Sequence, residues 1–168
     1  MEELTEKEKF EKIQQILNEL NIETSIVEHE PAVTTELADK FIEGLEGVRT
    51  KSMFITNKKK KNFYLVILDD SKRLDMSKFQ EIVGDKQLRL VSEELLHEKM
   101  KLQPGVVSPF GLLFNTDHDI KFYFDKDIAE QSIQTFHPNT NTKTMFIKTT
   151  DLFKFVEKIG YEVNIIDL

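Results

Sequence analysis

The feature that most constrains the fold is a pair of apolar, aromatic segments separated by a run of four lysines. The segments span residues 51–56 and 63–68, and the lysines occupy positions 58–61. Short apolar runs on either side of a polar connection are typical of consecutive strands. We therefore expect a β-hairpin here, with the lysines at its tip, and a sheet that begins at this hairpin.

Helices are predicted where apolar residues recur at helical spacing. Near the amino terminus, Thr5 and Glu8 have the form of a capping box, and the apolar stripe that follows indicates an amphipathic helix. Another helix is expected over residues 76–83, and Gly84 would end it. Further helices are expected from Thr34 or Thr35 to Phe41, after Ser92, and over residues 152–159.

Further segments are strand-like, and together with the helices they define the fold class. Helices and strands alternate irregularly, and several strands follow one another closely. We therefore expect an α+β fold with a mixed sheet flanked by helices, rather than a parallel doubly wound sheet. A chain of 168 residues with 39% hydrophobic content fits one domain, 1–168, with the helix of residues 1–22 packed on it. The strand-like segments are 24–27, 88–91, 112–114, 120–124, 144–147 and 161–166.

Composition excludes several functional classes. The net charge of −7 argues against a protein that coats DNA or any other nucleic acid, and the lysine run is either a solvated turn or a local RNA contact. The sequence contains no cysteine, no signal-peptide core at its start, and no apolar run near the ~20 residues that a membrane span needs. We expect a cytoplasmic protein without a membrane segment.

Cofactor and metal chemistry are not indicated either. The sequence has no nucleophile elbow, phosphate loop or dinucleotide fingerprint, and its four histidines show no paired zinc spacing. Asp117, His118 and Asp119 are adjacent on a polar turn, so their side chains should diverge, and we expect a solvated turn rather than a metal site. No cofactor and no metal are predicted.

Three short motifs carry the functional signal. Lys51 lies in Thr-Lys-Ser-Met-Phe, Gly105 begins the Gly-x-x-x-Pro loop that ends at Pro109, and His137 lies in Phe-His-Pro-Asn. Each has a structural alternative, respectively a charge on an edge strand, a tight loop, and a hydrogen bond within a turn. In the functional interpretation the three converge on one pocket, where a stiff loop presents backbone groups to a ligand.

In this order the motifs resemble the YbaK/ProX family, freestanding relatives of the editing domain inserted in bacterial prolyl-tRNA synthetases. The resemblance extends from about Val27 to Leu168. It implies a curved, largely antiparallel sheet flanked by helices. It also implies that Lys51 holds the phosphate of the terminal adenosine, that the loop binds the ester, and that His137 binds the substrate amino group or orients water.

The resemblance places the rest of the site as well. Lys51, Gly105 and Ser108 are the expected catalytic residues. A weaker match, His-Glu-Pro-Ala-Val-Thr beginning at His29, brings further residues to the pocket wall. The expected substrate-binding residues are Pro31, Val33, Thr34, Pro109, Phe110, Gly111, His137 and Asn141.

The implied function is hydrolysis of Ala-tRNA(Pro), with the acceptor end of tRNA(Pro) and prolyl-tRNA synthetase as partners. An aminoacyl ester is already activated, so positioned water and a stabilised oxyanion can replace a catalytic triad. The sequence Phe-His-Pro-Asn-x-Asn-Thr-x-Thr is closer to the ProX branch, which favours alanine, whereas removal of cysteine is the preference of the YbaK branch. The alternatives are that cysteine preference, a noncatalytic module that binds tRNA or an aminoacyl-like ligand, and a structural interaction domain.

Overall fold

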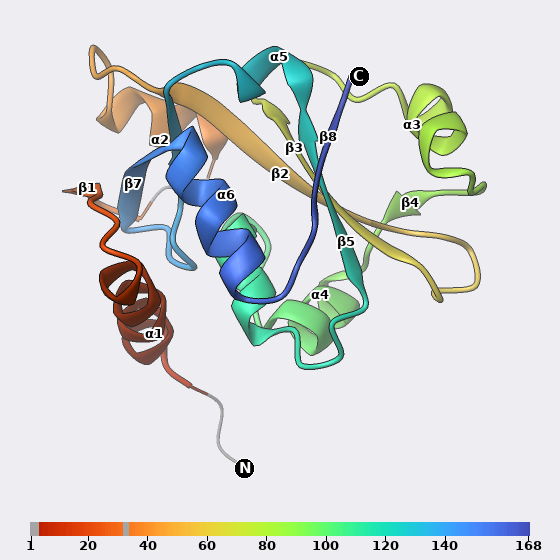
Figure 1. Ribbon diagram of the computed structural model, residues 1–168, viewed down its shortest axis with the longest axis horizontal. Helices are drawn as coiled ribbons and strands as arrows, with labels where there is room; N and C mark the ends of the chain where they lie inside the picture. Colours follow the sequence, from red (N-terminus) through yellow and green to blue (C-terminus); the bar gives the residue numbers. More distant parts are fainter. Residues whose placement is uncertain (1–3, 32–33) are drawn as a thin grey trace.

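The computed structural model describes residues 4–31 and 34–168, which form one mixed sheet with helices around it (Figure 1). The eight strands follow the order β1-β7-β6-β2-β3-β5-β8, and β4 pairs with β2 beside this path. The strands are β1 (Ser25–Glu28), β2 (Val48–Thr56), β3 (Phe63–Asp69), β4 (Arg89–Leu90), β5 (Ile120–Asp125), β6 (Ile133–Phe136), β7 (Lys143–Lys148) and β8 (Val163–Ile166). The helices are α1 (Glu6–Glu19), α2 (Thr35–Phe41), α3 (Met76–Val83), α4 (Glu93–Met100), the 3-10 helix η1 (Pro109–Phe114), α5 (Lys126–Ala129) and α6 (Thr149–Lys158).

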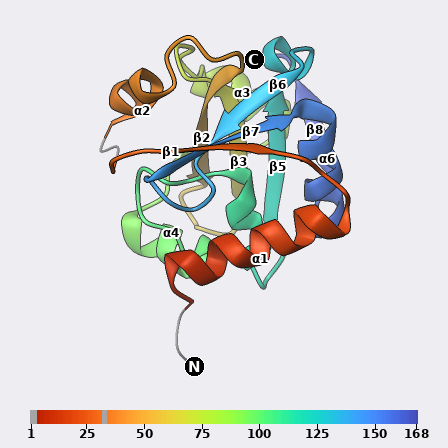
Figure 2. The ribbon, with the colours of Figure 1, turned by 90° about the vertical axis from the view of Figure 1, so that its left-hand side faces the viewer.

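Strand β2 joins the two parts of the sheet. Its first residues, Val48 and Arg49, pair in parallel with β6, whereas residues 50–56 pair antiparallel with β3. Its last two residues, Ile55 and Thr56, also pair antiparallel with β4. The β1 and β7 strands therefore run across the direction of β3 and β5 (Figure 2). Among the described strands, four pairings are antiparallel and three are parallel.

Strand β3 is buried on both faces, which explains its uninterrupted apolar sequence. Leu65 and Ile67 belong to the larger core cluster, which also includes residues of α1, α4, η1 and α6. Tyr64, Val66 and Leu68 alternate with them and pack in a smaller cluster with Phe79 of α3. Helices thus cover both faces of the strand, so the β2–β3 hairpin forms the centre of the fold.

The structure confirms most of the predicted elements. The class is a mixture of helices and a mixed sheet, as predicted, and β2 and β3 form the expected hairpin. The capping box is present, because Thr5 Oγ1 accepts from Glu8 N at 3.1 Å and Thr5 N donates to Glu8 Oε1 at 3.1 Å. Gly84 ends α3 in the left-handed conformation, with φ of 70°.

The strand predicted at residues 112–114 is wrong, because this segment belongs to η1. Ser108 Oγ accepts from Phe110 N at 3.2 Å, and Pro109 occupies the first turn, so the two residues start a helix rather than a strand. Two elements were not predicted, namely the short helix α5 and strand β6. In β6, Gln134 and Thr135 interrupt the apolar pattern although both are buried.

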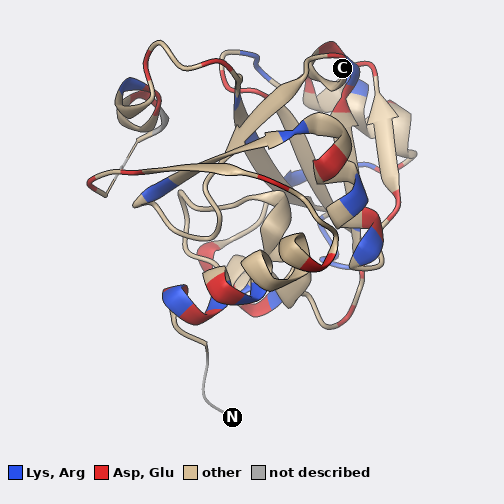
Figure 3. Ribbon diagram, turned by 60° about the vertical axis from the view of Figure 1, so that its left-hand side comes forward, with Lys and Arg blue, Asp and Glu red and all other residues tan. Residues whose placement is uncertain are grey.

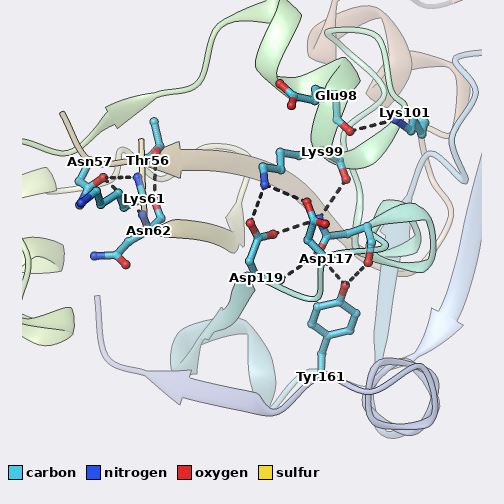
Figure 4. Close-up of polar contacts among 11 residues, drawn as sticks. Thr56, Asn57, Lys61, Asn62, Glu98, Lys99, Lys101, Asp117, Asp119 and Tyr161 are labelled. Carbon is cyan, nitrogen blue, oxygen red and sulfur yellow. Dashed lines mark hydrogen bonds and ion pairs between the residues drawn. The ribbon is translucent and has the colours of Figure 1, made fainter. Parts of the chain in front are cut away.

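The polar turn around Asp117 is anchored rather than freely solvated (Figure 4). Lys99 Nζ lies 3.1 Å from Asp117 Oδ2 and 2.6 Å from Asp119 Oδ2. The Tyr161 hydroxyl, which is buried, lies 3.0 Å from the carbonyl oxygen of Leu112 and 3.1 Å from that of Asn115. The described residues contain no cluster of three or more side chains suited to a metal, and none of the described helices is long and apolar enough to cross a membrane.

We expect Tyr161→Phe to destabilise the protein by about 1–2 kcal/mol, because it removes a buried hydroxyl that is hydrogen-bonded to the carbonyl oxygens of Leu112 and Asn115. Urea unfolding measures the change. Tyr123→Phe is the matched control, since the Tyr123 hydroxyl makes no hydrogen bond with another described residue. Equal stability of the two variants would contradict a structural role for the Tyr161 hydroxyl.

Candidate functional site

A cavity of about 260 Å³ opens beside the point where β2 changes partner from β6 to β3. Helix α2, strands β2, β6 and β7, and the loop before η1 contribute to its wall. The cavity brings together residues that are far apart in the sequence. Its lining residues are Thr34, Ala38, Asp39, Ile42, Thr50, Lys51, Ser52, Gly105, Val107, Thr135, Phe136, His137 and Thr144.

Lys51 supplies a cation to this wall. It lies on β2 opposite Leu68 and is half-buried. No hydrogen bond or ion pair joins its ammonium to another residue of the described ranges, whereas Lys72 and Lys99 each bind two carboxylates. In the view of Figure 3, Lys and Arg are interspersed with Asp and Glu rather than gathered into one band. A phosphate would therefore meet a local cation at Lys51, not a general positive field.

Gly105 leaves bare backbone at the rim of the cavity. Its φ is +90°, a conformation that other residues rarely adopt, and no atom lies within 4 Å of where a Cβ would stand. The residue is exposed, so the adjacent peptide groups are open to a ligand. This arrangement suits a loop that contacts substrate through its backbone.

His137 is held in one tautomer. Its Nδ1 donates to the Lys143 carbonyl oxygen at 3.1 Å, so in the neutral ring Nε2 is an acceptor. Burial lowers the pKa of His137, the charge of His29 lowers it further, and the Lys143 carbonyl and Asp39 oppose the shift. The ring is therefore neutral at pH 7 and can accept a hydrogen bond from water or from an amine.

His29 supports the same wall from outside. Its Nδ1 donates to the carbonyl oxygen of Glu30 at 2.8 Å, and its Nε2 is hydrogen-bonded to Thr144 Oγ1 at 2.9 Å. The ring stacks on Phe41 at 4.8 Å and meets His137 edge-on at 6.4 Å. Both ring nitrogens are thus engaged, and His29 orients Thr144 and the end of α2.

A carboxyl pair, Asp39 and Asp70, lies at the α2 side of the cavity. Burial, a hydrogen bond to the Asp39 carboxyl and the charges of Asp39 and Asp69 together raise the pKa of Asp70 to about 7, against the effect of Arg49. Asp70 Oδ2 is buried and receives no hydrogen bond from a nitrogen or hydroxyl donor. When Asp70 is protonated and hydrogen-bonded to the Asp39 carboxyl, the pair holds one negative charge, which is its main state below about pH 7.

A second hollow, a groove of about 330 Å³, adjoins the cavity. The two share Lys51, Ser52, Gly105 and Val107. The groove then continues along β2, β4 and the start of α4, where its floor is largely apolar. Leu90 stands in this groove with 57% of its side chain exposed.

The cavity unites four of the predicted site residues, namely Lys51, Gly105, Thr34 and His137. Thr34 also caps α2, because its Oγ1 accepts from Leu37 N at 3.1 Å. Other predicted residues do not line it. Pro31 is exposed, Asn141 is half-buried in the loop before β7, and Val33 lies outside the described residues.

The predicted roles of Ser108 and of the residues after it do not fit their surroundings. Ser108 is fully buried, caps η1, and donates to Asn139 Oδ1 at 3.3 Å, which favours a structural role. Pro109 and Phe110 are buried in the core. A Cβ on Gly111 would lie 2.6 Å from Leu102 Cδ1, so this glycine permits close packing within the protein, not the approach of a ligand.

Sequence reasoning missed several lining residues, whose roles depend on the fold. Thr50 and Ser52 flank Lys51, so a search of its neighbours would have found them. Asp39 and Thr135 carry no motif, whereas Thr144 is the last residue of the Phe-His-Pro-Asn-x-Asn-Thr-x-Thr sequence but was given no role. The pairing of β6 with β2 and β7 brings the two threonines to the cavity.

Comparisons with known proteins identify relatives of the chain. Residues 29–155 match the family model of the aminoacyl-tRNA editing domain. The chain is 33% identical over 153 residues to the prolyl-tRNA editing protein ProX of Acetoanaerobium sticklandii, covering 90% of this chain and 93% of that protein. It is 33% identical over 159 residues to the prolyl-tRNA synthetase associated domain-containing protein 1 of Mus musculus, covering 92% and 94%. A crystal structure described as a proposed trans-editing enzyme for prolyl-tRNA synthetase shares the fold, with a TM-score of 0.73 and 20% identity over 99% of this chain and 98% of the other.

We expect the stability contributed by neutral Asp70 to be lost as pH rises from 5 to 8. The pKa in the folded protein, about 7, lies above the ordinary value of 3.8, so the folded state holds the extra proton. The two pH units from 5 to the pKa of the folded state correspond to about 3 kcal/mol, which solvent screening reduces to roughly 1–2 kcal/mol, or about 2–6 °C in the unfolding midpoint.

Thermal unfolding at both pH values measures this loss. Asp70→Asn should remove most of it, whereas Asp167→Asn, at an exposed carboxyl, should retain it. Profiles of the wild type and Asp70→Asn that fall in parallel would show that Asp70 is ionised throughout.

Proposed function

The chain belongs to the aminoacyl-tRNA editing domain family of deacylases, and we propose that it removes alanine from mischarged tRNA(Pro) in trans. The observation that carries the proposal is the convergence of Lys51, Gly105 and neutral His137 on one cavity with a groove beside it. The relatives named for prolyl-tRNA editing and for association with prolyl-tRNA synthetase support tRNA(Pro) as the substrate and that synthetase as a partner.

The ester lies where the two hollows meet. The aminoacyl group enters the cavity, and the terminal nucleotide lies in the groove, because Lys51 and Gly105 border both. Lys51 binds the nucleotide phosphate as a compact cation. Leu90 and the other apolar residues of the groove give the adenine base a surface on which to pack.

The reaction is hydrolysis of an ester by a positioned water. His137 Nε2 accepts a hydrogen bond from the water, whose oxygen attacks the carbonyl carbon. Backbone N–H groups of the loop at Gly105 stabilise the oxyanion. The bond between the carbonyl carbon and the ribose oxygen then breaks, a proton passes to that oxygen, and free alanine and tRNA(Pro) are released.

We propose that the size of the cavity sets the selectivity for alanine. Ala38, Thr50 and Thr135 line the cavity, and in this proposal the wall accepts a methyl group and excludes the ring of a correctly attached proline. Exclusion by a clash discriminates more strongly than the ~1–3 kcal/mol that one methylene of contact supplies. Cysteine is the alternative substrate, since it exceeds alanine by a single sulfur atom.

A deacylation panel with alanine, cysteine, serine and proline on tRNA(Pro) tests the proposal. Alanine should be released fastest and proline slowest. Lys51→Ala should reduce the rate roughly a hundredfold or more, whereas Lys148→Ala, which changes an exposed lysine outside the cavity, should leave it unchanged.

Three other outcomes of these experiments would change the proposal. Fastest release of cysteine would select that substrate instead. Binding of charged tRNA without hydrolysis would favour a noncatalytic module, and full activity of Lys51→Ala would exclude the role given to Lys51.

The groove assignment makes a separate prediction about substrate affinity. Leu90→Glu should raise KM for charged tRNA(Pro) about tenfold and change kcat less than about twofold, because it removes apolar packing and adds a charge that repels phosphate. Ile82→Glu is the control, since Ile82 is an exposed residue of α3 outside the groove. Equal KM values for the two variants would show that the terminal nucleotide does not bind in this groove.

A further inference from the structure

The cavity wall carries two opposite charges. Among the described residues that line it, Asp39 is the carboxylate and Lys51 is the cation without an ion pair. An aminoacyl ester of tRNA has the complementary polarity, since its α-ammonium is on the acyl side and its phosphate on the nucleotide side. The match assigns a partner to each charge, phosphate to Lys51 and ammonium to Asp39.

Asp39 lies on a helix whose end is held by Arg49, and no ion pair joins the two side chains in the described residues. The guanidinium of Arg49 donates to the carbonyl oxygen of Ile42, which follows α2, at 2.8 Å, and to those of Leu45 and Gly47 in the next loop at 2.7 Å each. This clamp fixes the C-terminal end of the helix that carries Asp39. Three N–H groups of Arg49 are thus used on the backbone, and Asp39 lines the cavity.

Asp70 supports Asp39 from outside the cavity. It follows β3, does not line the cavity, and its carboxyl is hydrogen-bonded to that of Asp39. A neutral Asp70 donates this bond, so the negative charge of the pair resides on Asp39. The other titratable groups that act on these residues are Asp69, Arg49 and His137.

We propose that Asp39 binds the α-ammonium group of the aminoacyl ester and that Asp70 is the positioning residue that orients the Asp39 carboxylate. The assignment rests on the proposed function, and it leaves His137 free to orient water. It predicts that the enzyme prefers an α-amino acyl group to an α-hydroxy acyl group of the same shape.

The test compares alanyl-tRNA(Pro) with lactyl-tRNA(Pro), in which a hydroxyl replaces the ammonium. Asp39→Asn should lower kcat/KM for the alanyl ester about 10- to 100-fold and change that for the lactyl ester less than about twofold. Glu36→Gln is the matched control, since Glu36 is an exposed residue of the same helix outside the cavity. Equal losses on both esters, with an unchanged unfolding midpoint, would overturn the assignment.

A binding experiment keeps the assignment independent of catalysis. The probes are adenosine analogues whose 3′-amide carries either an alanyl or a lactyl group and cannot be hydrolysed as an ester. The wild type should bind the alanyl analogue about tenfold more tightly, and Asp39→Asn should lose this preference. If the wild type shows the preference but hydrolyses neither tRNA ester, the proposed hydrolysis fails and the ammonium site stands; if it shows no preference, the ammonium site fails.

A separate experiment tests whether Asp70 orients the Asp39 carboxylate. Asp70→Asn resembles the neutral acid, so it should retain the preference for the alanyl analogue between pH 6 and pH 7.5, where the wild type loses part of it because Asp70 ionises and the α-ammonium of the analogue is still largely protonated. Asp70→Ala should weaken the preference at all pH values. An identical pH profile in the wild type and both variants would overturn the positioning role.

Discussion

The sharing of β2 between two parts of the sheet is the constraint on which the structure depends. One strand provides hydrogen bonds to β6 at its start and to β3 over the rest of its length, so the two parts of the sheet must turn about it. Where the backbones of β2 and β6 diverge, hydrogen bonds from side chains connect the two strands. Thr50 Oγ1 donates to the Thr135 carbonyl oxygen, and Thr135 Oγ1 donates to the Val48 carbonyl oxygen at 2.8 Å. Lys51 follows immediately, so the change of partner itself creates the cavity beside the lysine.

The polar side chains at the cavity depend on neighbouring groups, which fix their protonation state and orientation. His137 is fixed as an acceptor at Nε2 by one backbone carbonyl and is neutral because it is buried. Asp39 shares a proton with Asp70, whose carboxyl is kept neutral mainly by burial. Lys51, by contrast, is not held by a partner, since no described carboxylate pairs with it. The cavity therefore has defined donors, acceptors and charges before a ligand enters.

The sequence predicted the elements with strong local signals and failed where long-range contacts decide. The β2–β3 hairpin, the capping box at Thr5 and the Gly84 cap were predicted because short-range spacing determines them. Strand β6 was missed because its polar residues are buried by partners distant in the sequence: Thr135 Oγ1, for example, donates to the carbonyl oxygen of Val48, and the carbonyl oxygen of Thr135 accepts from Thr50 Oγ1. The motifs singled out Lys51, Gly105 and His137, which line one cavity in the structure, whereas no motif marks Asp39, which lines the same cavity. The two ends of the Gly-x-x-x-Pro loop lie in different surroundings. Gly105 lines the cavity, whereas Pro109 begins the buried helix η1.

The Arg49 clamp has a consequence for how such a site can change in evolution. Arg49 and Lys51 are two residues apart on β2, and Arg49 fixes the helix that carries Asp39. Strand β2 therefore sets the distance between the cation of Lys51 and the carboxylate of Asp39. The side chains of Ala38 and Ile42 line the same cavity, but Arg49 binds only the backbone oxygen of Ile42. Mutations of these two side chains can therefore change the size of the accepted group while the distance between Lys51 and Asp39 stays the same.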